Sequence, residues 1–234
     1  MMSPDASFHR FETPDALAQS LSDAIAVDLS EAIAERGRAT LLVSGGSTPL
    51  RLFRALRKKP IAWEYVRVGL CDERWVPESD PASNAAFVKR ELLQDHAAAA
   101  TFVGIYTEGV VPEEAEALCS RRLKEWLWPF DVIVLGMGTD AHTASLFPWN
   151  PRLQEALEKS DPELCIAMTP SDAPHPRMSL TLQAILSAGH IYLHFEGEEK
   201  LRVYEEALQG DDAFAMPIRA VLKQNEKKIE VYYA

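Results

Sequence analysis

Cysteine is scarce in this sequence of 234 residues, which contains only Cys71, Cys119 and Cys165. The three are far apart, odd in number, and each lies in an apolar stretch of the kind that forms a core. We therefore expect reduced structural thiols. No group of histidines and cysteines has the spacing of a zinc site, so the sequence predicts neither a metal nor a cofactor.

The sequence also lacks a long apolar segment. Nowhere does an uninterrupted apolar run of about 18 residues occur, which is the length that a membrane-spanning helix needs. Residues 1–10 contain neither the apolar region nor the cleavage pattern of a secretory leader. These absences predict a cytoplasmic protein that does not contact a membrane.

Positive charge is in deficit. Lysine and arginine total 24 against 35 aspartates and glutamates, a net charge of -11. No global field would draw such a protein to nucleic acid or to an anionic membrane, so an anionic ligand must be held by locally placed cations and amides. The length and the 47% hydrophobic content fit a single domain over 1–234. The sequence leaves the oligomeric state open, and a monomer or a weak dimer fits it.

Apolar residues recur at helical spacing between Thr13 and Gly37, with Pro14 in the first turn, which predicts a long amphipathic helix. An apolar run at 39–43 follows and ends in a glycine loop, after which a helix at 50–56 is predicted. The same alternation continues to the C-terminus. It predicts strands at 66–71, 101–105, 131–135, 164–168, 190–195 and 228–233, and helices at 85–93, 113–126 and 198–208.

Alternating strands and helices of this kind predict a Rossmann-like α/β domain: a mostly parallel sheet with helices on both faces. The loops after the strands then lie along one edge, where ligands of such sheets bind. Proline-containing stretches at 76–81, 148–151 and 169–176 are long enough to be functional loops.

A glycine loop follows the first predicted strand, at residues 44–49. Its flexible backbone, three hydroxyls and adjoining helix start suit a phosphate group. No Gly-Lys-Ser/Thr follows, so it is not a nucleotide-triphosphate loop. The alternative is a tight turn with Thr48 capping the helix. The candidate phosphate-binding residues are Ser44, Gly45, Gly46, Ser47 and Thr48.

Three charged residues, Asp72, Glu73 and Arg74, follow the next predicted strand. Charges in that position face the predicted binding edge and are costly unless they are solvated or paired. The alternative is a surface turn in which one carboxylate pairs with Arg74.

A second glycine turn, at 136–148, carries Asp140 and His142 two residues apart. A carboxylate can fix the tautomer of an imidazole that acts as a general base. A structural histidine is the alternative. The glycines fit a dinucleotide fingerprint, but Pro148 and Pro151 would cut short the helix that it requires. An acyl-enzyme on Ser145 is conceivable, although the chain has no G-x-S-x-G elbow.

Two further cations stand out. Arg177 lies in the segment 175–181, and Lys200 lies at a predicted helix start. Each suits a phosphate, although a solvated surface cation is the alternative for either one. The other histidines, including His9, His96, His190 and His194, carry no signal.

Together these segments resemble the 6-phosphogluconolactonase family, in the same order, over residues 10–230. The matching segments are SGGSTP at 44–49, DERWV at 72–76, GMGTDAHTASLFP at 136–148, PRMSLT at 176–181 and GEEK at 197–200.

The resemblance implies a hydrolase that opens 6-phospho-D-glucono-1,5-lactone, a phosphorylated sugar lactone, in the oxidative pentose phosphate pathway. It implies His142 as the base, oriented by Asp140, with Arg74 at the oxyanion. The implied substrate-binding residues are the glycine loop, Asp72, Arg177 and Lys200.

One residue departs from the family pattern: Ala141 stands where the family has glycine before the histidine. If that position takes positive φ, alanine strains the loop by about 1 kcal/mol. Two alternatives stay open. A related aminosugar-phosphate deaminase would need a Glu where this chain has Phe147, and a non-catalytic sugar-phosphate sensor would be supported only by Ala141.

Overall fold

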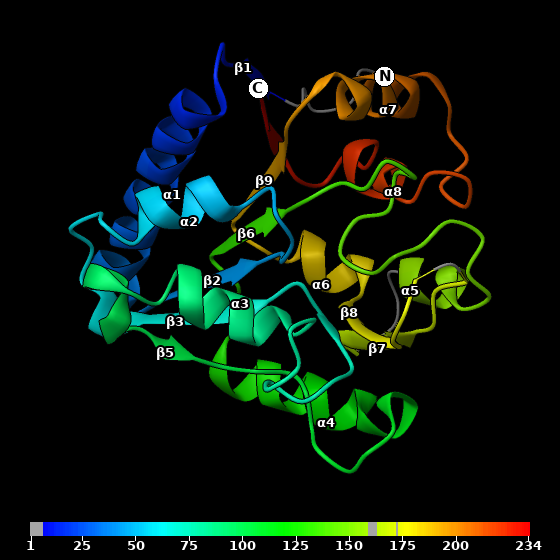
Figure 1. The fold of residues 1–234 in the computed structure, drawn as a ribbon, viewed down its shortest axis with the longest axis horizontal. Coiled ribbons are helices and arrows are strands. Elements are labelled where there is room, and N and C mark those ends of the chain that lie inside the picture. Colours follow the sequence, from blue (N-terminus) through cyan, green and yellow to red (C-terminus); the bar gives the residue numbers. More distant parts are fainter. Residues whose placement is uncertain (1–6, 159–162, 172) are drawn as a thin grey trace.

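The computed structural model describes residues 7–158, 163–171 and 173–234, and a seven-stranded parallel sheet runs through its centre (Figure 1). Its strand order is β1-β10-β9-β6-β2-β3-β5. The predicted parallel α/β fold is confirmed. The single domain over 1–234 stays a prediction, and both this range and the predicted loop at 169–176 include residues outside the described ones. The strands are β1 (Ser7–Arg10), β2 (Ala39–Val43), β3 (Val66–Leu70), β5 (Thr101–Phe102), β6 (Val132–Leu135), β9 (His190–Phe195) and β10 (Ile229–Tyr233).

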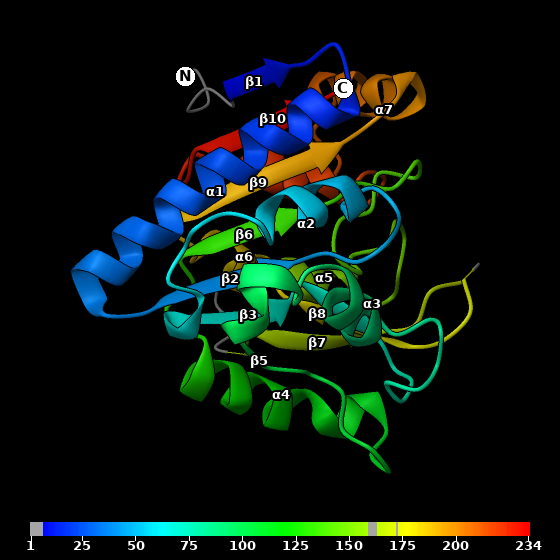
Figure 2. The same ribbon diagram turned by 60° about the vertical axis from the view of Figure 1, so that its left-hand side comes forward.

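Helices cover both faces of this sheet (Figures 1 and 2). On one face lie α1 (Pro14–Arg36), α2 (Leu50–Leu56) and α3 (Asn84–Glu91), and on the other α6 (Leu182–Leu186) and α8 (Ile218–Leu222). Among the helices in the described ranges, none has the length and apolarity needed to cross a membrane. The remaining helices are α4 (Pro112–Trp126), α5 (Leu153–Leu157) and α7 (Glu198–Gln209), with 3-10 turns η1 (Trp63–Tyr65) and η2 (Asp95–Ala99).

The long helix α1 forms where the sequence pattern predicted it. The Thr13 hydroxyl accepts a hydrogen bond from the Ala16 amide (3.2 Å), Pro14 opens the first turn, and Gly37 ends the helix with φ 72°. Its apolar stripe is fully buried against the sheet, so packing stabilises the helix. The stripe consists of Leu17, Leu21, Ile25 and Leu29.

A separate three-stranded antiparallel sheet was not predicted. It contains β4 (Asp72–Arg74), β8 (Arg177–Leu180) and β7 (Cys165–Met168), in that order. The strand at 164–168 was expected, but its place outside the main sheet was not. The strand β4 consists of three charged residues and therefore shows no apolar pattern. This small sheet carries two of the predicted site arginines.

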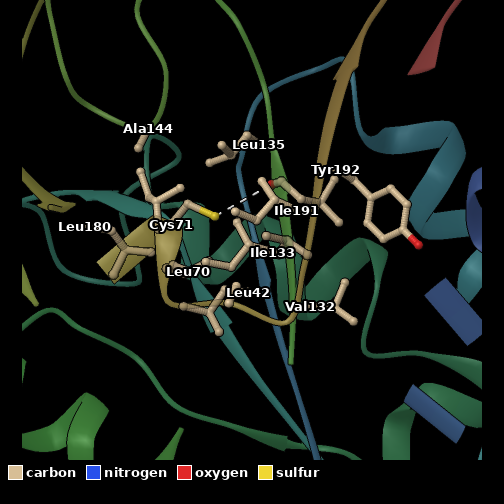
Figure 3. Close-up of a cluster of buried hydrophobic side chains, with 14 of the residues drawn as sticks. Leu42, Leu70, Cys71, Val132, Ile133, Leu135, Ala144, Leu180, Ile191 and Tyr192 are labelled. Carbon is tan, nitrogen blue, oxygen red and sulfur yellow. Dashed lines mark hydrogen bonds between the residues drawn. The ribbon is translucent and has the colours of Figure 1, made fainter. Parts of the chain in front are cut away.

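Apolar side chains from neighbouring parallel strands fill the interior (Figure 3). Leu42, Leu70, Ile133 and Ile191 come from four different strands and are at most 1% exposed. Cys71 Sγ lies among them, 3.6 Å from the carbonyl oxygen of Val134. All three cysteines are buried free thiols, as predicted. The strands β2 and β6 are buried at every position, as expected for central strands of a parallel sheet covered on both faces.

Candidate active site

A cavity of about 240 Å³ opens at the carboxyl edge of the parallel sheet. Its walls come from the segments that follow β2, β3, β6 and β9, so the predicted convergence of these loops is confirmed. It adjoins a wider groove of about 1160 Å³, and His142 and Lys200 line both. The predicted site residues in its wall are Ser44, Gly45, Gly46, Ser47, Thr48, Asp72, Arg74, His142 and Lys200.

The glycine loop is held by the strands beside it. The Ser44 amide donates to the Val134 carbonyl (3.1 Å), and the Ser44 hydroxyl accepts from the Gly136 amide (3.3 Å). A Cβ on Gly45 would lie 2.0 Å from Asn84 Oδ1, so only glycine fits there. Gly46 has φ 93°. The two glycines thus bring bare backbone to the cavity wall, which is what close approach to a phosphate requires.

Thr48 does not cap the following helix, so that alternative is wrong. The cap residue of α2 is Pro49, which makes no side-chain hydrogen bond. The Thr48 hydroxyl instead accepts from Lys200 Nζ (3.4 Å). Burial lowers the pKa of Lys200, and the charges of Glu196 and Glu199 oppose that shift. A desolvated ammonium beside bare amides is a suitable partner for an anion.

Asp72 and Glu73 are 8% and 1% exposed, so the interpretation of this segment as a solvated surface turn is wrong. Asp72 Oδ2 accepts from Ser145 Oγ (2.7 Å), which ties β4 to the second glycine turn. Glu73 accepts from the amides of Asn84 (2.7 Å) and Ala85 (2.8 Å) at the start of α3. Burial raises the pKa of Glu73 although these amide bonds oppose the shift. Glu73 therefore has a structural role behind the site.

Arg74 and Arg177 are register partners across β4 and β8. Arg74 Nη1 donates to the Ala82 carbonyl (2.6 Å), and its side chain lines the cavity. Arg177 is 7% exposed, is not among the cavity-lining residues, and its buried Nη1 has no hydrogen-bond partner within the described ranges. Burial, followed by the charge of Arg74, lowers the pKa of Arg177. The carboxylates of Asp72 and Glu73 also lie close to Arg177, and their charges oppose this shift.

The second glycine turn brings Asp140 and His142 together. Asp140 Oδ1 lies 2.5 Å from His142 Nδ1 and accepts from the His142 amide (3.1 Å). Burial raises the pKa of Asp140, but the hydrogen bond and charge of His142 outweigh it and lower the pKa overall. A charged Asp140 holds a proton on Nδ1, which leaves Nε2 of a neutral ring free to accept one. The pair is therefore built like a general base and its orienting group.

Ala141 has φ 66° and is 1% exposed, so the departure from the family glycine falls at a left-handed position. The Ile218 amide donates to its carbonyl (3.0 Å), which holds the residue in place. No helix follows the turn directly, because α5 begins only at Leu153. The dinucleotide fingerprint therefore lacks the helix that would bind a pyrophosphate.

Two residues of this turn bear on the alternatives. Ser145 is 1% exposed and donates to Asp72, so it does not form the Ser-His pair of an acyl-enzyme. Phe147 packs against His142 with ring centroids 5.0 Å apart. An apolar ring thus occupies the place where a deaminase would need a carboxylate.

Two cavity residues with polar side chains, Asn84 and His194, were not predicted. Asn84 donates from Nδ2 to the Asp72 carbonyl (2.9 Å), and its place in the wall follows only from the packing of α3. His194 is 2% exposed at the end of β9 and lines the cavity, although sequence gave it no signal. Its position near the carboxyl end of an apolar strand, like that of Ser44, could have identified it. Within the described ranges, no three histidine, cysteine, aspartate or glutamate side chains are grouped to hold a metal.

Comparisons with known proteins agree with this geometry. The family model described as glucosamine-6-phosphate isomerases/6-phosphogluconolactonase matches residues 12–230. A 6-phosphogluconolactonase of Rhizobium meliloti is 44% identical over 229 residues, covering 98% of this chain and 99% of the relative. One from Neisseria meningitidis is 41% identical, covering 97% and 98%.

Solved structures give the same result. The crystal structure of a 6-phosphogluconolactonase from Shewanella baltica is 45% identical to this chain, with a TM-score of 0.95, and covers 100% of this chain and 99% of that one. A monomeric glucosamine-6-phosphate deaminase shares the fold, with a TM-score of 0.75 at 17% identity. The chain belongs to the 6-phosphogluconolactonase family, within the larger family of glucosamine-6-phosphate isomerases and 6-phosphogluconolactonases.

Proposed function

We propose that this chain hydrolyses 6-phospho-D-glucono-1,5-lactone to 6-phosphogluconate, with His142 activating the attacking water. One observation carries the proposal. The Asp140–His142 pair, 2.5 Å apart, has its imidazole in the wall of the same cavity as the bare glycine loop and Lys200. A base and an anion-binding end in one cavity suit an ester substrate with a remote phosphate. The relatives' activity supports the same substrate.

In this mechanism His142 takes a proton from water as the water oxygen attacks the lactone carbonyl carbon. The carbonyl electrons move to its oxygen, giving a tetrahedral oxyanion. When this intermediate collapses, the bond from the carbonyl carbon to the ring oxygen breaks, and the imidazolium returns its proton to that oxygen. Asp140 stabilises the imidazolium in between. The balance needs neither a metal nor a cofactor.

The oxyanion is assigned to Arg74 and to amides of the second glycine turn. Arg74, on the small sheet, lines the same cavity as His142, which lies on the loop after β6. A fixed cation stabilises developing negative charge strongly where water is excluded. Asp72 keeps Ser145, and with it the turn, in place. It also lines the cavity, where a free carboxylate oxygen suits a sugar hydroxyl.

The phosphate is assigned to residues 44–48 and Lys200. Binding energy from that remote group orients the carbonyl beside His142. The support for Arg177 is weaker, because it does not line the cavity. Its unpartnered Nη1 and its place beside Arg74 favour an electrostatic contribution, and a direct phosphate contact stays a prediction.

The first experiment generates the lactone in situ from glucose 6-phosphate and follows its loss above the spontaneous rate. Wild type should accelerate opening by orders of magnitude without added metal, and folded His142→Ala should fall close to background. Equal loss with and without wild-type protein would rule out the lactonase. Ammonia release from glucosamine 6-phosphate would then favour the deaminase, and binding of 6-phosphogluconate without turnover would favour a sensor.

A further inference from the structure

A buried histidine lies at the end of the cavity that we assign to phosphate. His194 is on β9, is 2% exposed, and lines the cavity together with Thr48 and Lys200. Histidine with this degree of burial normally has its ring nitrogens hydrogen-bonded. Here Nε2 has no hydrogen-bond partner within the described ranges. This buried ring nitrogen can therefore take a further hydrogen-bond partner from the cavity.

Glu196 lies beside this histidine: its Oε1 is 3.3 Å from His194 Nε2 but is not aligned for a hydrogen bond. Glu196 also faces Arg51 of α2, at 3.7 Å. The contact with His194 lowers the pKa of Glu196 despite partial burial, with further contributions from Arg51 and Lys200. A charged carboxylate thus lies close to the cation meant for the substrate.

This arrangement is unfavourable for an incoming dianion. The negative charge of Glu196 offsets the positive charge of Lys200, so a phosphate bringing about two negative charges would leave this corner with excess negative charge. A neutral imidazole does nothing to correct that excess. An imidazolium would add a positive charge and two N–H donors at the cavity wall.

We propose that His194 is a proton-linked member of the phosphate subsite: its imidazole takes up a proton from solvent when the phosphate binds. One N–H bond forms on the ring as the bond from the proton to a water or buffer molecule breaks, the side chain gains one positive charge, and no other bond of the protein changes. The inference rests on the proposed function, because it assumes that the phosphate occupies this end. The titratable and charged groups around His194 are Glu196 on β9, Lys200 on α7, Arg51 on α2 with its partner Asp15, Tyr232 on β10, and Asp72, Arg74 and His142 in the cavity wall.

Calorimetric titration with 6-phosphogluconate at pH 8 tests the proposal. At that pH a phosphate ester with its second pKa near about 6 is already dianionic, so proton uptake comes from the protein. Measuring in two buffers with different ionisation enthalpies gives the number of protons taken up. Wild type should take up a substantial part of one proton, and His194→Asn should take up almost none. At pH 7 this variant should bind about tenfold more weakly, the loss expected for one charge-assisted hydrogen bond.

Two other histidines serve as controls. His190→Asn changes the exposed opposite end of the same strand and should leave uptake unchanged. His142→Asn tests whether the catalytic imidazole is the group that takes up the proton. If proton uptake disappears in His142→Asn but persists in His194→Asn, the proposal is overturned. Binding by wild type without uptake also overturns it and leaves the proposed function intact. Absence of any binding by wild type overturns both. If neither His194→Asn nor His194→Gln folds, uptake that persists in both His142→Asn and Lys200→Arg supports the proposal, and its loss in either variant overturns it, because the pKa of Lys200 is also lowered.

Discussion

Replacing Gly138 by alanine should disable the Asp140–His142 pair while leaving the fold intact. A Cβ at this position would lie 2.2 Å from His142 Nδ1 and 2.5 Å from Asp140 Oδ1. Non-bonded heavy atoms normally approach to about 3.5 Å, so the imidazole must retreat by about 1 Å. A displacement of that size costs about 100-fold in rate, so kcat should fall by about that factor.

The stability of Gly138→Ala should change little. Alanine restricts the unfolded chain and contributes about 0.4–1 kcal/mol, which offsets part of the cost of the disturbed ion pair. The assay is lactone loss above the spontaneous rate, with unfolding in urea measured in parallel. Gly104→Ala is the matched control, because its Cβ would meet Phe102 at an ordinary 3.5 Å far from the cavity. A Gly138→Ala protein with kcat within twofold of wild type would refute the assignment of this pair as the base.

Three further outcomes are expected. Ala141→Gly removes the strain of a left-handed alanine, which is worth about 1–2 kcal/mol. Glycine also makes the unfolded chain more flexible, which costs about 0.4–1 kcal/mol of stability. Urea unfolding should therefore show a net gain in the free energy of unfolding of under about 1.5 kcal/mol, and a net loss would show that this position is not strained. Lys200 carries its positive charge below its lowered pKa and loses it above that pKa. Binding of 6-phosphogluconate should therefore weaken before the pH reaches 10.5, the ordinary pKa of lysine. Lys200→Arg should bind without this loss at alkaline pH. Glu73→Ala leaves the amides of Asn84 and Ala85 without their hydrogen-bond acceptor. The free energy of unfolding measured in urea should therefore fall by at least about 2 kcal/mol. A fall of less than about 0.5 kcal/mol would contradict the structural role of Glu73.

The main sheet could be predicted because its strands are short apolar runs between helices with clear start and stop residues. Thr13, Pro14 and Gly37, for example, mark both ends of α1. The strands at the edges of the sheet were harder to predict. Only Thr101–Phe102 of the expected strand at 101–105 pairs as a strand, and β1 was not predicted because its four residues alternate between partly buried and exposed positions. Edge strands contribute few apolar residues, so their pattern is weak.

Some residues of the candidate site could also be predicted from the sequence, and others could not. Asp140 and His142 are two residues apart, so one motif predicted their contact. Asn84 and His194 reach the cavity through packing of α3 and through strand order, which no local pattern contains. The alternatives for Asp72, Glu73 and Thr48 failed for a related reason. Asp72 and Glu73 were judged as surface residues, whereas packing buries them around the small sheet. Thr48 was judged as a helix cap, whereas its hydroxyl meets Lys200 of α7.

The cavity has a proposed phosphate end and a proposed catalytic end, and the parallel sheet holds these two ends at a distance that suits hydrolysis of a phosphorylated lactone. The loop that we propose for the phosphate follows β2, and the proposed base follows β6. These two strands are register-paired at Leu41–Val132, Leu42–Ile133 and Val43–Val134. Because both strands are buried on both faces, the distance from the phosphate end to the imidazole is set by the core. The choice between an ester and an amine substrate then depends on residues outside β2 and β6. Phe147 beside His142 supplies no second carboxylate for acid–base work on an amine. Arg74, which lies on the small sheet, is the positive charge that we propose for the ester oxyanion.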